Sequence, residues 1–142
     1  MVIAIPKSVL AEIGQHGEKA YPEETAGFLF GADGGQRRVE RVFQLENSRE
    51  EDARRNRYLI TPDDMLSAEK EANRLGVEII GVFHSHPDHR SQPSSYDLEW
   101  ALPWFSYLIT TVQSGKAQDS RAWRLKEDRS GFTEEEIKLE EG

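Results

Sequence analysis

An apolar run that ends at a pair of histidines is the feature that most restricts the fold of this chain. Residues 77–83 read VEIIGVF, and the polar segment His84-Ser85-His86-Pro87 follows at once. A strand of this composition belongs in the centre of a sheet that is covered on both faces. The sequence therefore predicts an α/β fold with this strand in the middle.

Periodicity and turn residues predict the elements around this strand. Helices are expected over residues 6–20, 61–74 and 93–102. Further strands are expected over residues 25–31, 37–45, 58–60, 107–112, 121–126 and 131–139, with an exposed connection at 47–57 and loops at 84–92 and 114–120. The acidic run 134–136 is expected on a solvated strand edge. This order of elements predicts a single domain over residues 1–142, with one mixed β-sheet flanked by helices.

The charge balance and the lack of cysteine argue against several classes of function. The 142 residues include 18 Lys and Arg against 26 Asp and Glu, and the formal net charge of −8 disfavours nucleic acid and anionic membranes as partners. With no cysteine, the chain forms no disulfide, thiolate zinc site or iron–sulfur cluster. The sequence has no basic leader and no apolar stretch near the ~18 residues of a membrane span, so we expect a cytoplasmic protein.

His84 and His86 are spaced as two ligands of one metal ion. On extended backbone, residues two apart point to the same side, so both imidazoles can bind one ion at ~2.0–2.1 Å. Asp97, at the start of the next expected helix, is the natural third ligand, and two imidazoles with a carboxylate suit Zn2+. Three protein ligands leave the fourth tetrahedral position for water, whose pKa the metal can lower to about 7. This arrangement is typical of a catalytic zinc site.

Hydrolysis at such a site also needs a general base. The HExxH motif, which supplies ligands and base from one helix, is absent from the sequence. Glu23 and Glu24 directly precede the expected strand 25–31, and a strand adjacent to 77–83 would bring one of them to the metal. The residues alone do not choose between the two.

Each of these residues also has an ordinary structural interpretation. A His-x-His-Pro segment can be a polar loop whose hydrogen bonds are satisfied. Ser94 and Asp97 have the spacing of a helix capping box, in which Ser94 is the N-cap and Asp97 interacts with the helix dipole. His89 could act as a fourth ligand and close the site into a structural one.

Taken together, the candidate residues resemble the signature of the JAMM (MPN+) metalloprotease family. That signature is an upstream Glu, then His-x-His-Pro, then Ser, two residues and Asp. The residues that match it, position by position, are Glu24, His84, His86, Ser94 and Asp97. The resemblance implies that His84, His86 and Asp97 hold Zn2+. It also implies that Glu24 is the general base and acid, and that Ser94 stabilises the oxyanion.

The same resemblance implies a fold and a substrate class. It covers about residues 20–112, and family members share a cytidine-deaminase-like α/β fold with a mixed sheet, the JAB/MPN fold. Active members cleave the bond after the C-terminal Gly-Gly tail of ubiquitin or ubiquitin-like proteins, and small prokaryotic members act on ubiquitin-like and sulfur-carrier proteins. A zinc metallopeptidase or isopeptidase with such a substrate is therefore the expected function.

Two alternatives follow from other members of this family. One is a non-catalytic MPN-type protein-binding scaffold, with a structural metal or none, which the presence of every ligand disfavours. The other is a DNA-associated protein similar to the RadC branch. The net charge of −8 and the lack of a basic stripe disfavour DNA binding.

Overall fold

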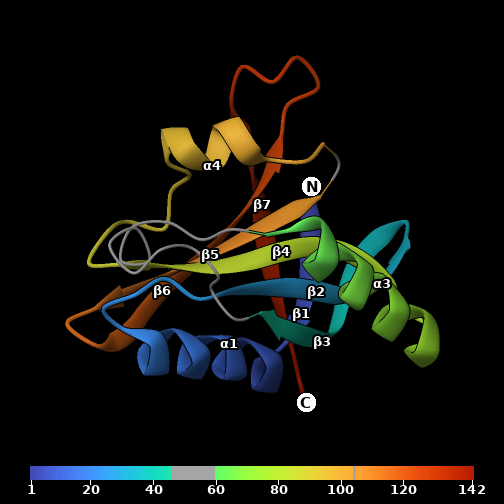
Figure 1. Cartoon of the computed structure of the whole chain (residues 1–142), viewed down its shortest axis with the longest axis horizontal. Coiled ribbons are helices and arrows are strands. Elements are labelled where there is room, and N and C mark those ends of the chain that lie inside the picture. The colour runs from blue at the N-terminus through green and yellow to red at the C-terminus, as the bar shows by residue number, and fades with distance from the viewer. Residues whose placement is uncertain (46–59, 104) are drawn as a thin grey trace.

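The structure is a computed structural model that describes residues 1–45, 60–103 and 105–142. Within those residues the strands form one mixed sheet in the order β1-β3-β2-β4-β5-β6-β7, which closes into a barrel where β7 pairs with β1. The strands are β1 Val2–Pro6, β2 Ala26–Gly34, β3 Gln36–Leu45, β4 Glu78–Pro87, β5 Ser106–Gln113, β6 Lys116–Leu125 and β7 Phe132–Glu140. The helices are α1 Lys7–Ala20, α3 Pro62–Leu75 and α4 Ser95–Trp100 (Figure 1). The predicted α/β fold, a mixed sheet flanked by helices, is confirmed.

Helices cover both faces of the sheet, and each face has its own apolar core. In Figure 1, α1 lies on one side of the sheet, and α3 and α4 lie on the other. The core on the α1 side includes Ile3, Ile5, Val9, Ile13, Leu29, Val39, Ile80, Phe83, Leu108 and Ala122. The core on the α3 and α4 side includes Phe28, Phe30, Ala68, Ala72, Val82, Ala101, Phe105 and Tyr107. Val82 and Phe83 thus face opposite cores, as expected for a central strand with both faces buried.

β4 extends through the His-x-His-Pro segment, which we expected to be a loop. Its parallel pairing with β5 continues as far as Pro87, opposite Val112. The polar side chains suggested a loop, but the neighbouring strand holds the backbone extended. The expected loop 114–120 is too long for the same reason, because Lys116 already pairs with Gln113 at the start of β6.

The two ends of the chain pair with each other, which the sequence analysis did not anticipate. β1 runs parallel to β7 and pairs with it from Val2, opposite Glu136, to Pro6, opposite Glu140. The expectation that residues 134–136 form a solvated edge is wrong at Glu135, because β6 and β1 lie on either side of β7. Glu135 is only 1% exposed, and its Oε2 accepts a 2.7 Å hydrogen bond from Arg124 Nη2.

The helix boundaries follow the capping signals in the sequence. Thr61 and Asp64 exchange the two hydrogen bonds of a capping box at the start of α3, and Gly76 ends the helix in the left-handed conformation (φ 73°). α4 begins at Ser95 and ends at Trp100, before the expected residue 102. None of the described helices is long and apolar enough to cross a membrane. The expected connection 47–57 and residues 58 and 59 of the expected strand lie outside the described residues.

Candidate metal centre

The end of β4 places His84 and His86 on the same face of the sheet. Val82 packs in the core on the α3 and α4 side, and the alternation of an extended strand puts both histidines on that side as well. Ser85 points to the other face, where it lies against Gly17 of α1. The two residues are so close that a Cβ atom added to Gly17 would be 3.3 Å from the Ser85 Cβ. Both imidazoles are buried. Their side chains therefore lie where the spacing of the sequence motif predicts.

Asp97 reaches the histidines from the first turn of α4. Ser94 is the N-cap of this helix, and its Oγ accepts a 3.1 Å hydrogen bond from Asp97 N. Asp97 Oδ2 in turn accepts a 2.8 Å hydrogen bond from Ser94 N. This capping box fixes the direction of the carboxylate. The capping interpretation of these two residues is confirmed, and the same carboxylate also faces both histidines.

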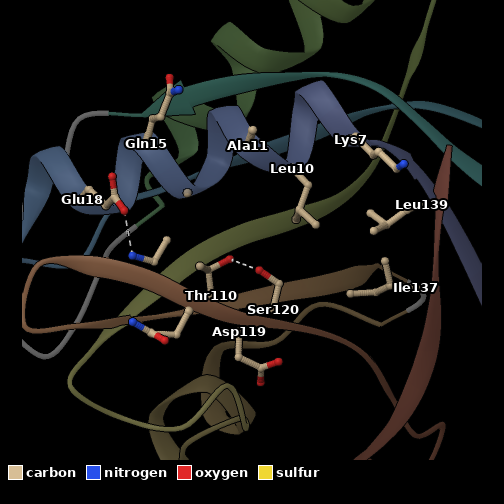
Figure 2. Close-up of a pocket in the computed structure, with 13 residues that line it drawn as sticks. Lys7, Leu10, Ala11, Gln15, Glu18, Thr110, Asp119, Ser120, Ile137 and Leu139 are labelled. Carbon is tan, nitrogen blue, oxygen red and sulfur yellow. Dashed lines mark hydrogen bonds between the residues drawn. The ribbon is translucent and has the colours of Figure 1, made fainter. Parts of the chain in front are cut away.

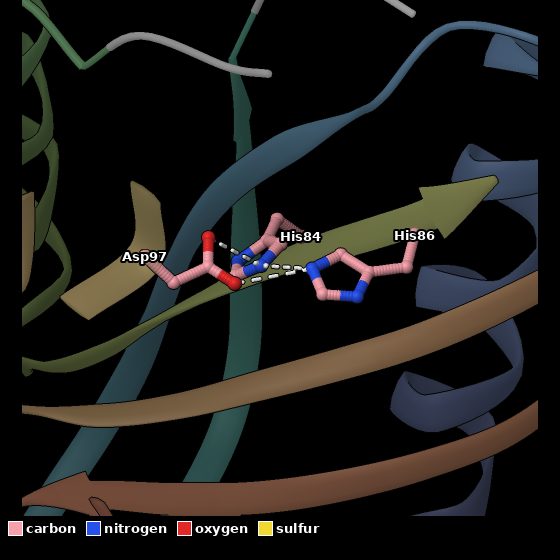
Figure 3. A group of neighbouring side chains, drawn as sticks. All are labelled: His84, His86 and Asp97. Carbon is pink, nitrogen blue, oxygen red and sulfur yellow. Dashed lines mark hydrogen bonds and ion pairs between the residues drawn. The ribbon is translucent and has the colours of Figure 1, made fainter. Parts of the chain in front are cut away.

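The three side chains converge on one point (Figure 3). The Nε2 atoms of His84 and His86 lie 3.1 Å apart, and the carboxylate oxygens of Asp97 lie 3.3 Å from His84 Nε2 and 3.1 Å from His86 Nε2. Ligands at ~2.0–2.1 Å from a tetrahedral zinc ion lie roughly 3.3 Å from one another. The two imidazole nitrogens, and the Asp97 oxygen that lies nearest to each of them, are therefore spaced as neighbouring ligands of one zinc ion would be.

The protonation states of these groups suit a divalent cation. Burial lowers the pKa of His84, so its imidazole is neutral at neutral pH. Burial acts to raise the pKa of Asp97, but the close contacts with the two imidazoles and the hydrogen bond from Ser94 N outweigh it, so the pKa is lowered. A neutral imidazole and an ionised carboxylate are the forms that bind metal.

A backbone carbonyl orients the second histidine. His86 Nδ1 lies 2.8 Å from the carbonyl oxygen of Arg90, which can only accept a hydrogen bond. Nδ1 therefore donates its proton to this carbonyl, which leaves Nε2 as the nitrogen that can bind a metal ion. Sequence analysis missed this contact, because a backbone carbonyl carries no signal in the side-chain pattern.

The loop that carries this carbonyl is anchored by β5 and β6. Thr111 Oγ1 donates a 2.7 Å hydrogen bond to His89 O, and the Ser91 and Thr111 hydroxyls lie 2.7 Å apart. Trp123 Nε1 donates a 2.9 Å hydrogen bond to Ser91 O. These contacts hold the loop on both sides of Arg90. They join residues 20 or more positions apart, so no local pattern could have indicated them.

Glu24 and Glu23 differ in burial and in the face of the sheet to which strand alternation would direct their side chains. Ala26 of β2 pairs with His84, and Thr25 and Ser85 are joined by two hydrogen bonds, Thr25 N to Ser85 Oγ (2.9 Å) and Ser85 N to Thr25 O (3.0 Å). If this register continued by one more residue, Glu24 would lie beside His86, on the face that carries the candidate ligands. Glu24 is buried, whereas Glu23 is only partly buried.

His89 and Ser94 are exposed and lie outside the group of donor atoms. Among the described residues, the atoms that lie within 4.8 Å of one another belong to His84, His86 and Asp97. His89 is not in this group, so the alternative of a closed four-ligand site with His89 is not supported. Ser94 is exposed at the N-terminus of α4, where its hydroxyl is accessible to a bound molecule.

A groove on the opposite face of the sheet is separate from this centre. It has a volume of about 550 Å³ and lies between α1 and strands β6 and β7 (Figure 2). Thr110 Oγ1 and Ser120 Oγ lie 2.7 Å apart in it, and Ala117 N donates a 2.8 Å hydrogen bond to Glu18 Oε2. These polar groups bind one another, on the face of the sheet opposite to the one that carries the candidate ligands.

Comparisons with known proteins agree with this geometry. Residues 6–126 match the family model of prokaryotic homologs of the JAB domain. The chain is 31% identical over 117 residues to a probable TtuB-protein conjugate cleaving protease of Thermus thermophilus, covering 80% of this chain and 75% of that protein. It is 32% identical over 104 residues to a desampylase of Pyrococcus furiosus, covering 73% of this chain and 68% of that protein.

Solved structures share the fold. A protein from Desulfitobacterium hafniense matches with a TM-score of 0.86 and 34% identity, over 99% of this chain and 94% of that chain. A JAB1/MPN domain protein from Archaeoglobus fulgidus matches with a TM-score of 0.62 and 18% identity, over 98% of this chain and 97% of that chain. At 18% identity the likeness shows the fold alone. That fold is the JAB/MPN fold expected from the sequence.

Proposed function

Because the chain belongs to the family of prokaryotic homologs of the JAB domain, we propose that it is a zinc-dependent metallopeptidase of the JAMM type. The observation that carries this proposal is the convergence of His84, His86 and Asp97, whose donor atoms lie within 4.8 Å of one another. Two imidazoles and a carboxylate with this spacing fit a zinc ion and leave one position of its tetrahedron open. An open position is what distinguishes catalytic from structural zinc.

The names of the relatives support a substrate class. One relative is named as a protease that cleaves TtuB-protein conjugates, and the other as a desampylase. By this similarity the chain hydrolyses the bond that follows the C-terminal Gly-Gly tail of a ubiquitin-like or sulfur-carrier protein. The substrate is then a protein conjugate, in keeping with a net charge of −8 that disfavours nucleic acid.

Glu24 is the proton carrier of the proposed reaction. Zinc held by the three ligands supplies polarisation of the scissile carbonyl and a lowered pKa of the attacking water. The Glu24 carboxylate takes a proton from that water as the water attacks the carbonyl carbon, and then gives the proton to the leaving amine nitrogen. Its burial and the β2–β4 register support Glu24 over Glu23 for this role.

Ser94 is the proposed donor to the substrate oxygen. Its Oγ already accepts a hydrogen bond from Asp97 N, which fixes the hydroxyl beside the ligand set. The Ser94 O–H then donates to the carbonyl oxygen as negative charge develops on it, a contact that lowers the barrier by ~3 kcal/mol in comparable sites. The exposure of Ser94 supports this role, because the substrate must be able to reach the hydroxyl.

Cleavage of a defined conjugate tests the proposal. The protein is loaded with Zn2+ and incubated with a ubiquitin-like protein whose Gly-Gly carboxyl terminus is joined to a lysine of a second protein. We expect mass spectrometry to find the free tail and the free lysine, with loss of activity in a chelator and recovery on adding Zn2+. Bound zinc without hydrolysis of any such conjugate would support the scaffold alternative instead.

A further inference from the structure

The segment that carries Glu24 leaves α1 in a tight turn and is tied to the end of β4. Tyr21 N donates a 3.1 Å hydrogen bond to Gly17 O, and Glu23 N donates a 2.8 Å hydrogen bond to Ala20 O. The Tyr21 phenol crosses to the other segment and donates a 2.6 Å hydrogen bond to Asp88 Oδ2. Asp88 comes two residues after His86, and Tyr21 three residues before Glu24.

Asp88 is itself held in place by the turn between β5 and β6. Its Oδ1 accepts a 2.8 Å hydrogen bond from Ser114 N, and its own backbone N donates a 2.9 Å hydrogen bond to Val112 O. Its φ of 57° makes the chain turn directly after β4. One carboxylate oxygen thus binds the β5–β6 turn and the other binds Tyr21, so Asp88 joins three segments of the chain.

The other end of the segment is fixed by a different pair. Thr25 and Ser85 exchange two hydrogen bonds in the buried part of the sheet. The bond between Tyr21 and Asp88 holds the start of the segment beside the end of the same strand, in addition to the turn that joins it to α1. Glu24 lies between the two points of attachment.

We propose that Tyr21 and Asp88 are positioning residues that orient the Glu24 carboxylate beside the candidate metal centre, where it can exchange a proton with the attacking water. This inference rests on the proposed role of Glu24 as proton carrier. Neither residue touches the substrate. Their effect is on the orientation of Glu24, so the rate of the chemical step depends on them, and zinc binding does not.

Kinetics of Tyr21→Phe test the positioning role, since this change removes one hydroxyl and keeps the ring. We expect kcat to fall about tenfold, because small misplacements of a catalytic group are costly. We expect KM to stay within about twofold, as for a group that acts in the transition state only. Zinc affinity is expected to be unchanged. Asp88→Ala should lower kcat by a similar factor, and the double variant should be no slower than the worse single variant.

Asp128→Asn is the matched control. Asp128 also accepts a hydrogen bond from a backbone amide in a turn, that of Ser130 (2.9 Å), but it lies between β6 and β7. We expect this variant to have the kcat and KM of the natural chain. A loss of kcat in Asp128→Asn equal to that in Asp88→Ala would assign the effect to general destabilisation and overturn the proposal.

Hydrogen exchange separates this inference from the proposed function. We expect the backbone amides of residues 21 and 23–25 to exchange faster in Tyr21→Phe, whatever the protein hydrolyses. Unchanged exchange in that variant overturns the positioning role. Faster exchange together with an unchanged kcat overturns it too, because the Tyr21–Asp88 hydrogen bond would then restrain the segment without affecting catalysis by Glu24. The natural chain could also fail to cleave any conjugate while the exchange result is as expected. That outcome overturns the proposed function and the positioning role that rests on it. It leaves standing only the conclusion that the Tyr21–Asp88 hydrogen bond restrains the segment.

Discussion

Ser94 and Asp97 exchange two hydrogen bonds, of 2.8 and 3.1 Å, at the start of α4. The same Asp97 carboxylate lies 3.1 Å from His86 Nε2 and 3.3 Å from His84 Nε2. A helix-capping residue is therefore also a candidate metal ligand. The two roles predict different effects of a substitution. Loss of capping lowers the stability of the metal-free protein, whereas loss of a ligand lowers zinc affinity.

Asp97→Ala should abolish stoichiometric zinc binding. Removing a ligand should weaken zinc affinity by more than the about 10–100-fold typical of outer contacts. The same change removes one of the two hydrogen bonds of the capping box, that from Ser94 N, and should cost about 1 kcal/mol of the free energy of unfolding of the metal-free protein. Zinc content by mass spectrometry and thermal unfolding in chelator measure the two effects separately.

Asp64→Ala provides the control for the cap. Thr61 and Asp64 form the same capping box at the start of α3, a helix with no candidate ligand. We expect the same loss of about 1 kcal/mol with full zinc content. An Asp97→Ala protein that unfolds at a lower temperature but keeps its zinc would leave capping as the function of Asp97.

Glu24→Gln should bind zinc normally and lose turnover. The amide cannot take a proton from water, and general base catalysis typically contributes about 10²–10⁴-fold to the rate. Glu23→Gln, one residue away and only partly buried, should retain the natural rate. Rates of conjugate cleavage at equal zinc content provide the measurement. An inactive Glu23 variant beside an active Glu24 variant would reverse the assignment.

The candidate ligands could be predicted from the sequence because their arrangement is local. His84 and His86 are two apart on one strand, and strand geometry alone sends them to one side. Asp97 follows a helix start whose capping signals were visible in the sequence. Residue spacing could not provide the choice between Glu23 and Glu24, which came from the family resemblance alone, because that choice depends on how the segment before β2 lies against β4.

The contacts that hold the candidate site in place could not be predicted from the sequence, because they depend on tertiary structure. The Arg90 carbonyl, the Thr111 hydroxyl and the bond between Tyr21 and Asp88 act across segments distant in sequence. The extent of β4 was underestimated likewise, because pairing with β5 overrides the polar composition of its last residues. Glu135 was misjudged because its burial depends on the pairing of β7 with β1 and β6.

Ser94→Ala should lower kcat by about 10²–10³ if the hydroxyl donates to the oxyanion. It also removes the cap of α4, so a control for capping is required. Thr61→Ala removes the equivalent cap of α3 and should cost a similar free energy of unfolding, about 1 kcal/mol, without changing kcat. Steady-state kinetics and thermal unfolding of both variants distinguish the roles. If the two variants had equal and small effects on kcat, the role of Ser94 would be helix capping alone.

Thr111→Val should weaken zinc affinity although Thr111 is not a ligand. Its hydroxyl donates to His89 O and contacts Ser91 Oγ, and these contacts hold the loop whose Arg90 carbonyl orients His86. Loosening such a support typically costs about 10–100-fold in metal affinity. Competition with a chelating dye measures the dissociation constant.

The adjacent Thr110 gives a matched control on the opposite face of the same strand. It is buried, and its Oγ1 lies 2.7 Å from Ser120 Oγ in the groove beside α1 (Figure 2). Thr110→Val therefore removes a comparable buried hydrogen bond with no connection to His86. Its stability should fall about as much as that of Thr111→Val, by about 1 kcal/mol, and its zinc affinity should not change. Equal zinc affinities in the two variants would mean that the ring of His86 is oriented without the loop.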